Sequence, residues 1–503
     1  MQEQIREDRT DDRSLRGSRI PRLTSVVNAG IQFDFSLPGA RSLAMGGAFV
    51  ALADDATAAQ ANPAGLTRLY VKKPQLSVEG RGWNFFTLTP DRGHAFGTPT
   101  GIGTDAVLSA GRFPRAGAEF AGVQGQELND ATKSVSLVTF LYTRPGLDWV
   151  VAGYRHQLLN LVNRTESSGP FVTLPSGDVS RLAPFTGRIE TDIATYGVTV
   201  ARPIRRVSVG GGIGLSTFSI NSRAQSLLVA PHGRLLQPSE RASFTQVGEQ
   251  FGPADYSEQA VEYIDEQIGE DTAWSYNVGA SITMGMANVG GAFRKGPAFR
   301  YDTRFFAGPA LATGSLAERE LDRHEGIRFK VPDSYAVGLA LTPANTVKLT
   351  FEYAYVQYKQ LIDGSGTGLP VETAGQSRSA SPDVRADGVR EVEALEIDNT
   401  HQLRGGVEWS FLQRGLMADG TYTQTVFLRA GGWFDPDHRL RSKITDPATE
   451  RILAKAILLP KGRDEGHVSF GGGVILGGRV QLDAGVDLSP RVNTVAISTV
   501  VYF

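Results

Sequence analysis

Four basic residues stand at positions where a side chain can bind an anion. They are Arg294, Lys348, Arg404 and Arg429. Each falls on the polar side of a segment in which apolar and polar residues alternate, and a cation in such a place binds a carboxylate through charge-assisted hydrogen bonds. Acidic residues such as Glu408 share these polar sides, however, and buried charges need partners. Two roles therefore stay open for the four cations: binding a carboxylate ligand, or joining a structural charge network.

The chain lacks the residue patterns of the common enzyme classes. It contains no cysteine, which excludes disulfides, thiolate metal sites and cysteine nucleophiles. None of its seven histidines stands in an H-E-x-x-H motif, and no G-x-S-x-G motif of the serine hydrolases occurs. We therefore expect no enzymatic activity, no catalytic residues, no metal ion and no cofactor.

The composition excludes a helical membrane protein and gives no global preference for a charged partner. Across 503 residues the mean hydropathy is -0.17, and no run of about 18 apolar residues is present to form a membrane helix. Basic and acidic residues number 51 and 53, so the net charge of -2 creates no field that would attract nucleic acid. Glycine is frequent, with 58 residues, which is typical of extended chain and tight turns.

From about Pro74 onward, apolar and polar residues alternate, as they do in β-strands with two different faces. Each alternating segment is about 10 residues long, enough for a tilted strand to cross a bilayer. About fourteen such segments follow one another: 74–88, 134–143, 148–162, 188–202, 205–228, 271–286, 288–304, 328–342, 345–361, 398–411, 421–434, 465–477, 478–489 and 492–503.

The connections between these segments alternate between short and long. Pairs such as Pro343-Ala344 and Gly477-Gly478 are short connections, whereas 229–270 and 362–397 are long ones. Tight turns on one side and long loops on the other are typical of outer-membrane barrels, in which closure satisfies every backbone hydrogen bond. We therefore predict an all-β fold, a single transmembrane antiparallel β-barrel of about 14 strands over residues 74–503 with long extracellular loops. The expected location is the bacterial outer membrane, with its lipid as a partner.

The ends of the predicted strands support a membrane location. All five tryptophans fall in or near strand ends, and we expect two interfacial girdles of Trp149 and Trp409 on one side and Trp83, Trp274 and Trp433 on the other. The last strand finishes on an aromatic residue, Phe503, like the terminal strand by which outer-membrane barrels are recognised for assembly. Residues 1–27, by contrast, are charged and contain no secretory signal, so we expect a disordered tail.

Residues 28–73 do not alternate and are rich in alanine and glycine, with short helical stretches. The runs Gly39-Ala40-Arg41, Met45-Gly46-Gly47-Ala48, Ala53-Asp54-Asp55-Ala56 and Asn62-Pro63-Ala64-Gly65-Leu66 give this region its character. Asn62 can bond its own backbone while Pro63 fixes a turn, and Asp54 and Asp55 can cap neighbouring backbone groups. These residues either hold a plug in place or take part in a movement that admits a ligand.

This region resembles the N-terminal plug, or hatch, of the FadL family of outer-membrane transporters for long-chain fatty acids and other hydrophobic compounds. The resemblance implies that residues 28–73 form a hatch inside the barrel, with Asp54, Asp55, Asn62, Pro63, Ala64 and Gly65 as its motif. It implies a monomer that passes hydrophobic small molecules by passive diffusion, without nucleic acid. The same motif also occurs in PorV-like barrels, so the alternative is a docking component of a protein secretion system.

Two outer loops add to this resemblance. Residues 253–270 carry apolar side chains, Tyr263 and Ile264 among them, at helical spacing, which predicts an amphipathic helix. The next long loop begins with the apolar residues Phe305, Phe306 and Leu311. In the resembled family, two such loops form a hydrophobic groove where the ligand lands. The other interpretation is that the two loops only pack on each other.

Overall fold

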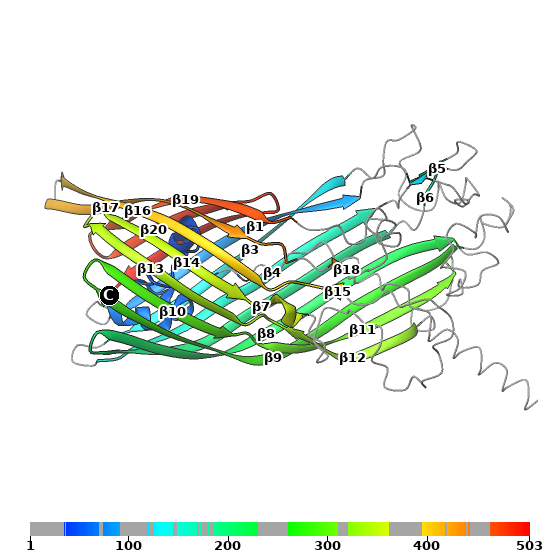
Figure 1. The fold of residues 1–503 in the computed structure, drawn as a ribbon, viewed down its shortest axis with the longest axis horizontal. Coiled ribbons are helices and arrows are strands. Elements are labelled where there is room, and N and C mark those ends of the chain that lie inside the picture. The colour runs from blue at the N-terminus through cyan, green and yellow to red at the C-terminus, as the bar shows by residue number, and fades with distance from the viewer. Residues whose placement is uncertain are drawn as a thin grey trace, which may run out of the picture.

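The computed structural model is a closed antiparallel barrel with a short helical segment inside one end (Figure 1). It describes residues 35, 37–69, 74–90, 119–120, 125–143, 148–167, 171–173, 179–181, 185–229, 260–309, 320–361, 395–417, 420–438, 441–442 and 463–503. The predicted tail, residues 1–27, lies outside these residues. None of the helices that the structure describes is long and apolar enough to span a membrane.

Fourteen strands form the wall, which confirms the predicted transmembrane antiparallel barrel. They are β1 (Gln75–Pro90), β3 (Gly125–Tyr142), β4 (Val150–Ser167), β7 (Phe185–Ile204), β8 (Val207–Val229), β9 (Ala260–Met284), β10 (Ala287–Lys295), β13 (Ser334–Ala344), β14 (Val347–Val356), β16 (Thr400–Met417), β17 (Gly420–Asp435), β19 (Glu465–Leu476), β20 (Val480–Leu488) and β21 (Val492–Tyr502). The pairing of β21 with β1 and of β9 with β10 closes the ring.

Short turns gather at the barrel end that holds the C-terminus (Figure 1). Four of them lie at 205–206, 285–286, 345–346 and 477–479. Gly477 and Gly478 have φ angles of 55° and 65°, a left-handed conformation that favours glycine because it has no Cβ. This end matches the predicted side of tight turns, although some turns lie two residues later than the sequence suggested.

The strands reach further into the predicted outer loops than expected. A hairpin of β11 (Ala298–Pro309) and β12 (Glu320–Lys330) extends the sheet, and β11 pairs with the outer part of β9. The predicted helix over 253–270 is therefore wrong for residues 260–270, which belong to β9; residues 253–259 lie outside the described part. The reason is pairing on both sides, because β8 and β11 both supply hydrogen-bond partners to this stretch.

Several small elements lie in the connections between the strands of the wall. The strands β2 (Glu119–Phe120), β5 (Phe171–Thr173) and β6 (Val179–Arg181) form one small sheet, and β15 (Leu395–Glu396) pairs with β18 (Arg441–Ser442) in another. A short 3-10 helix, η7 (Tyr358–Leu361), follows β14.

The outside of the barrel carries a belt of exposed apolar side chains, as a lipid-facing wall requires. Trp149, Trp274 and Trp409 belong to it and are exposed. Trp83 and Trp433 do not, so the predicted girdle positions of these two are wrong. They share the inward face of their strands with buried charged residues: the Arg81 guanidinium lies over the ring of Trp83, and Trp433 stacks on His467.

Candidate functional site

Residues 37–69 form what we call the hatch segment, which lies inside the barrel near its C-terminal end (Figure 1). It contains α3 (Ala40–Ala44), α4 (Ala58–Ala61) and η1 (Pro63–Leu69), and none of its residues is exposed. Small residues let its backbone approach the wall closely. A Cβ added to Gly46 would lie 2.6 Å from the amide nitrogen of Gly432, and one added to Gly406 would lie 2.4 Å from the carbonyl oxygen of Met45. Glycine on both sides of the contact therefore lets the backbone of the hatch segment pack directly against the backbone of the wall.

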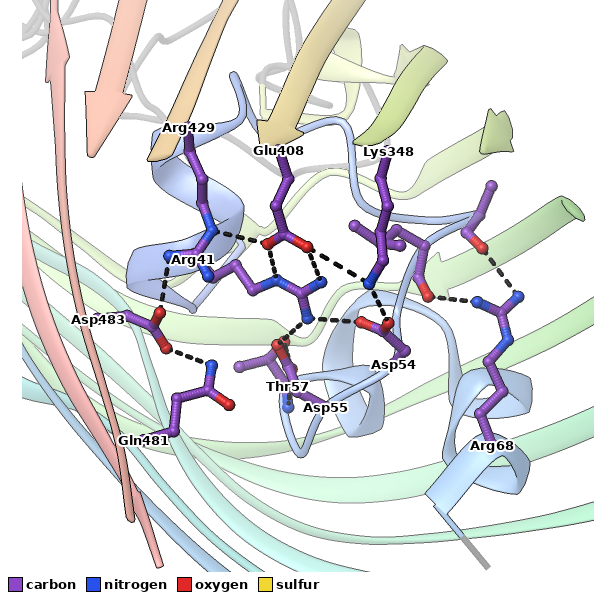
Figure 2. Close-up of polar contacts among 12 residues, drawn as sticks. Arg41, Asp54, Asp55, Thr57, Arg68, Lys348, Glu408, Arg429, Gln481 and Asp483 are labelled. Atoms are coloured by element: carbon purple, nitrogen blue, oxygen red, sulfur yellow. Dashed lines mark hydrogen bonds and ion pairs between the residues drawn. The ribbon is translucent and has the colours of Figure 1, made fainter. Parts of the chain in front are cut away.

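A buried charge network ties the hatch segment to the wall (Figure 2). Arg41 binds Glu408 of β16 with two nitrogens, at 2.7 and 2.9 Å, and its Nη1 lies 2.5 Å from Asp54 Oδ1. Lys348 of β14 lies 3.0 Å from Asp54 Oδ2 and 3.3 Å from Glu408 Oε1. Such bidentate, charge-assisted bonds fix geometry as well as contributing energy.

The same network continues along the wall. Arg429 of β17 donates from Nε to Glu408 Oε2 at 2.8 Å and from Nη1 to Asp483 Oδ1 at 2.7 Å. Lys348 and Arg429, two of the four candidate carboxylate-binding cations, are thus already paired with carboxylates. The structure brings them together around Glu408 and separates them from Arg294 and Arg404.

The two aspartates of the hatch motif have different electrostatic surroundings. Burial alone would raise the pKa of Asp54, but Arg41 and Lys348 outweigh it and hold that pKa well below its ordinary value. Burial dominates at Asp55 and raises its pKa, although Arg41 lies nearby. Asp55 also accepts the amide of Thr57 at 2.9 Å, which is the local capping bond expected from the sequence. Asp54 thus contributes a fixed negative charge, whereas Asp55 shapes the turn.

Asn62 fixes the turn between α4 and η1. Its Oδ1 accepts the amide of Ala64 at 3.1 Å, and its Nδ2 donates to the carbonyl oxygens of Val50 at 2.8 Å and Ala280 at 3.2 Å. A Cβ on Gly65 would lie only 2.1 Å from the carbonyl oxygen of Ala53, so this position requires glycine. The motif residues therefore stabilise the hatch segment and attach it to β9.

A cavity of about 90 Å³ lies between the hatch segment and the outer half of the lumen. Leu37 and Gln60 line it from the hatch side, and Val331 and Tyr358 line it from the outer side. Drug-sized ligands occupy pockets of roughly 300–1,000 Å³. A larger molecule therefore enters this cavity only if the surrounding chain moves.

Arg294 of β10 and Arg404 of β16 both line this cavity. Arg404 Nη2 donates to Gln402 at 2.6 Å, its Nη1 is 4.0 Å from Glu352 Oε1, and its Nε has no hydrogen-bond partner among the described residues. Arg294 makes no ion pair or side-chain hydrogen bond within the described part of the chain.

One carboxylate stands beside these two cations, and it is partly engaged elsewhere. Glu352 Oε2 accepts the hatch amides of Phe49 and Val50, each at 2.8 Å. Positive charge therefore exceeds negative charge around the cavity, as a site for an anionic group requires.

The outer half of the lumen is lined by an apolar cluster. Its side chains come from β4, β7, β8, β11, β12 and η7, and include Leu161, Ile189 and Tyr358. Phe218 is at its centre, stacked on Phe299 at 4.8 Å and on Phe329 at 5.4 Å between ring centroids. The interior of an outer-membrane barrel is ordinarily polar, so this buried apolar cluster departs from the usual lumen.

The predicted outer groove lies in paired strands rather than loops. Ile264 of β9 stands opposite Phe306 of β11, both buried, and Phe305 is next to them. The Tyr263 side chain and Leu311 lie outside the described residues. The two segments are thus neighbours, as both sequence interpretations require, and a role in landing a ligand stays a prediction.

The wall has a seam between β3 and β4 that the sequence did not reveal. These strands pair only between Leu137–Tyr142 and Val151–His156, whereas β1 with β3 and β4 with β7 pair along nearly their whole length. A register shift at Leu158 marks the level of the seam, and His156 and Leu158 also line the cavity. Side chains bridge the seam instead of a ladder: Arg155 donates to the carbonyl of Val135, and Thr132 Oγ1 to that of Asn160 at 3.1 Å.

No family model and no curated protein matches the chain. Among solved structures, it is similar to a FadL homologue from Pseudomonas aeruginosa, with 12% identity over 94% of this chain and 100% of that one and a TM-score of 0.56. It is also similar to the monoaromatic hydrocarbon channel CymD, with 12% identity over 94% and 99% of the two chains and a TM-score of 0.50. At such low identity the likeness concerns the fold. The chain therefore has the fold of the FadL-type transporters, a fourteen-stranded barrel with an N-terminal hatch.

Proposed function

We propose that the chain is a monomeric outer-membrane transporter that passes hydrophobic molecules inward by passive diffusion, long-chain fatty acids among them. The apolar cluster carries this proposal, because it lines the outer lumen with side chains that a hydrophobic molecule can replace without leaving polar groups unpaired. The similar structures support the same class of cargo, since one is a FadL homologue and the other a hydrocarbon channel.

A fatty acid also carries a carboxylate, and the cavity offers it two cations. Among the described residues, Glu352 pairs with Arg404 alone and also accepts hatch amides, so a ligand carboxylate adds a counter-charge where positive charge is in excess. Lys348 and Arg429 are less suited because the hatch network already holds them. The acyl chain of a bound fatty acid then extends outward into the apolar cluster.

The seam between β3 and β4 supplies a sideways exit. It reaches the level of the cavity, and only side-chain contacts cross it there. A hydrophobic molecule that leaves through the wall moves into lipid and avoids crossing the tightly packed hatch segment. This route needs no energy source beyond the concentration difference.

Transport fits the site better than catalysis or docking. The lumen offers apolar surface and paired charges, and of the two similar structures one is named as a hydrocarbon channel and the other as a FadL homologue. The secretion-docking alternative has no such support and is not favoured.

The test is uptake by cells that lack their own fatty-acid transporter and express this chain. We expect uptake of a long-chain fatty acid and of a neutral hydrocarbon such as toluene. The double variant Arg294→Gln with Arg404→Gln should lower fatty-acid uptake about tenfold, because a charge-assisted bond is worth roughly 1.5–3 kcal/mol, and should leave toluene uptake unchanged.

Arg188→Gln is the matched control, since Arg188 is an exposed arginine of the same barrel, paired with Glu190. It should change neither uptake. If the double variant lost uptake of both cargoes equally, the two arginines would not bind the carboxylate. If the unaltered protein took up neither cargo, the proposed transport function would be wrong.

A further inference from the structure

A row of polar side chains crosses three neighbouring strands toward the outer end of the apolar cluster. Ser222 of β8 and Thr303 of β11 stand on either side of Gln267 of β9, as its cross-strand neighbours. Ser222 and Thr303 are each 1% exposed, and Gln267 is fully buried. A glutamine amide in such a place has lost its contact with bulk water and needs partners inside the barrel.

This row faces the lumen. Ser222 lies two residues from Ile220, a member of the apolar cluster, and residues two apart on a strand share a face. Gly269, two residues from Gln267, faces Tyr301 of the same cluster, since a Cβ added to Gly269 would lie 2.5 Å from the Cβ of Tyr301. A molecule that occupies the apolar cluster therefore has these polar groups beside its outer end.

Three side chains at this level have hydrogen-bonding capacity to spare. Within the described chain, Gln267 has no hydrogen-bond partner for Nε2 or Oε1, and Ser222 has none for Oγ. Thr191 of the next strand, β7, likewise has no partner for Oγ1 among these residues and is buried. Thr303 and the neighbouring Asp265, by contrast, are engaged in interactions of their own. We call Thr191, Ser222 and Gln267 the outer polar site.

Other buried glutamines show what is missing there. Gln157 of β4 donates from Nε2 to the carbonyl oxygen of Leu159 at 2.8 Å and to Asp192 at 2.7 Å. Gln75 resembles Gln267, because it is fully buried and lacks partners for both amide atoms within the described residues. It stands at the start of β1, however, at the barrel end that holds the short turns and the C-terminus. Gln75 is therefore a matched comparison for Gln267, away from the apolar cluster.

The outer polar site and the cavity lie along one strand. Ser275 of β9 lines the cavity, and Gln267 precedes it by eight residues on the same face. At ~3.3 Å per residue this separation is about 26 Å along the strand. It is about 20 Å along the barrel axis for a strand tilted by about 40°. An extended long-chain fatty acid with its carboxylate at Arg294 and Arg404 spans this distance, and its far end then reaches Gln267.

The residue types at the outer polar site suit a neutral hydroxyl group. The amide of Gln267 offers both donors and an acceptor, and the hydroxyls of Ser222 and Thr191 can donate or accept. A ligand hydroxyl also does both, so it can satisfy Nε2 and Oε1 together. The methyl end of an ordinary fatty acid leaves both amide atoms unpaired. A second carboxylate would bury a charge among three side chains that carry none.

We propose that Gln267, together with Ser222 and Thr191, binds a hydroxyl group at the far end of the acyl chain, so that the lumen prefers omega-hydroxy fatty acids to unsubstituted ones. Gln267 Nε2 donates to the hydroxyl oxygen, and Oε1 accepts its proton. This inference rests on the proposed function, which supplies the carboxylate end of the same ligand, and it adds the class of fatty acid.

The test compares omega-hydroxypalmitic acid with palmitic acid, binding to purified full-length protein in detergent, by calorimetry. The unaltered protein should bind the hydroxy acid about tenfold more tightly, as hydrogen bonds to otherwise unpaired buried groups allow. Gln267→Leu should bind both acids alike, with the affinity that the unaltered protein has for palmitic acid. An apolar side chain of similar size leaves no polar atom unpaired, so this variant should fold, and a heat-modifiable shift on gels checks that it does.

Two controls make the result specific. Gln75→Leu removes an equally buried and unpartnered amide and should keep the tenfold preference. Alpha-hydroxypalmitic acid carries its hydroxyl beside the carboxylate and should bind the unaltered protein about as palmitic acid does.

Four outcomes would overturn the inference: equal binding of the omega-hydroxy acid and palmitic acid by the unaltered protein, a preference that survives in Gln267→Leu, a preference lost in Gln75→Leu, or equally tight binding of the alpha-hydroxy acid. Palmitic acid bound without any preference would contradict this inference alone. If neither acid bound the unaltered protein, the proposed function would fail as well.

Discussion

The two halves of the lumen hold their contents by different forces. The inner half contains the hatch segment, which Arg41, Glu408 and Lys348 attach to the wall through directional bonds between buried charges. The outer half contains aromatic and aliphatic side chains centred on Phe218. Charged partners are costly to separate in a buried site, whereas apolar contacts have no direction and can be exchanged for others.

This difference suggests a division of roles. A hydrophobic ligand can take the place of one apolar neighbour after another in the outer half, because no polar group loses a partner. The inner half allows no such exchange, since each charge removed leaves another unpaired. The cavity and the seam lie where the two halves meet, which is why the proposed route leaves sideways at this level.

The largest expected effect comes from breaking the inner half at its centre. Glu408→Ala leaves Arg41, Lys348 and Arg429 without their shared carboxylate. Removing one partner of a buried ion pair costs about 3–5 kcal/mol. We expect the hatch segment to lose protection from hydrogen exchange, measured by mass spectrometry on peptides from residues 37–69, while the strands keep theirs. Unchanged protection of these peptides would show that the network does not hold the hatch.

A charge in the outer half should have the next largest effect. Phe218→Asp places a carboxylate among Phe299, Phe329 and Tyr301, where a hydrophobic ligand would have to bury it. We expect fatty-acid binding to weaken at least tenfold, or about 1.4 kcal/mol, by equilibrium binding in detergent. Phe218→Leu keeps the site apolar and should bind nearly as the unaltered protein does. If the two variants bound alike, the apolar cluster would not be the ligand path.

The boundary between the halves can be tested by closing the seam. Thr132 Oγ1 donates to the main-chain carbonyl of Asn160 across it, and Leu161, the next residue of β4, is buried on the inward side as Thr132 is; the chain has no cysteine of its own. Thr132→Cys with Leu161→Cys, joined by a short reducible thiol cross-linker, should reduce hydrocarbon uptake several-fold, and a reductant should restore it. The same protein before cross-linking is the control. Undiminished uptake after complete cross-linking would mean that the ligand leaves by another way.

The sequence predicted the wall well because two environments impose period-two alternation on every strand that separates lipid from lumen. It failed where that alternation is interrupted. In the outer part of β9, Ile264 is 2% exposed and Ile268 is 47% exposed, although the two are four residues apart and a regular strand would place them on one face. Residues four apart also share one face of a helix, so the apolar residues of this stretch were wrongly assigned to an amphipathic helix.

Parts of the site could not be predicted from residue types. Arg41 stands in the hatch motif, but its partner Glu408 is 367 residues away, and only the closed barrel brings them together. The seam consists of missing backbone hydrogen bonds between β3 and β4, and the residue types of these strands do not predict where pairing stops. The inward direction of Trp433 could have been inferred, because it lies an even number of residues from Arg429 on the same strand.

The smallest expected effect sharpens the comparison from outside the lumen. Arg188 and Glu190 form the same kind of ion pair as Arg41 and Glu408, but their side chains are 59% and 43% exposed, against 9% and 2% for the inner pair. Water solvates both partners at the surface, so an exposed pair contributes only about 0–1 kcal/mol. Glu190→Gln should therefore change the urea midpoint of unfolding little, whereas Glu408→Ala should lower it clearly. Comparable shifts for the two variants would mean that burial does not set the strength of the hatch network.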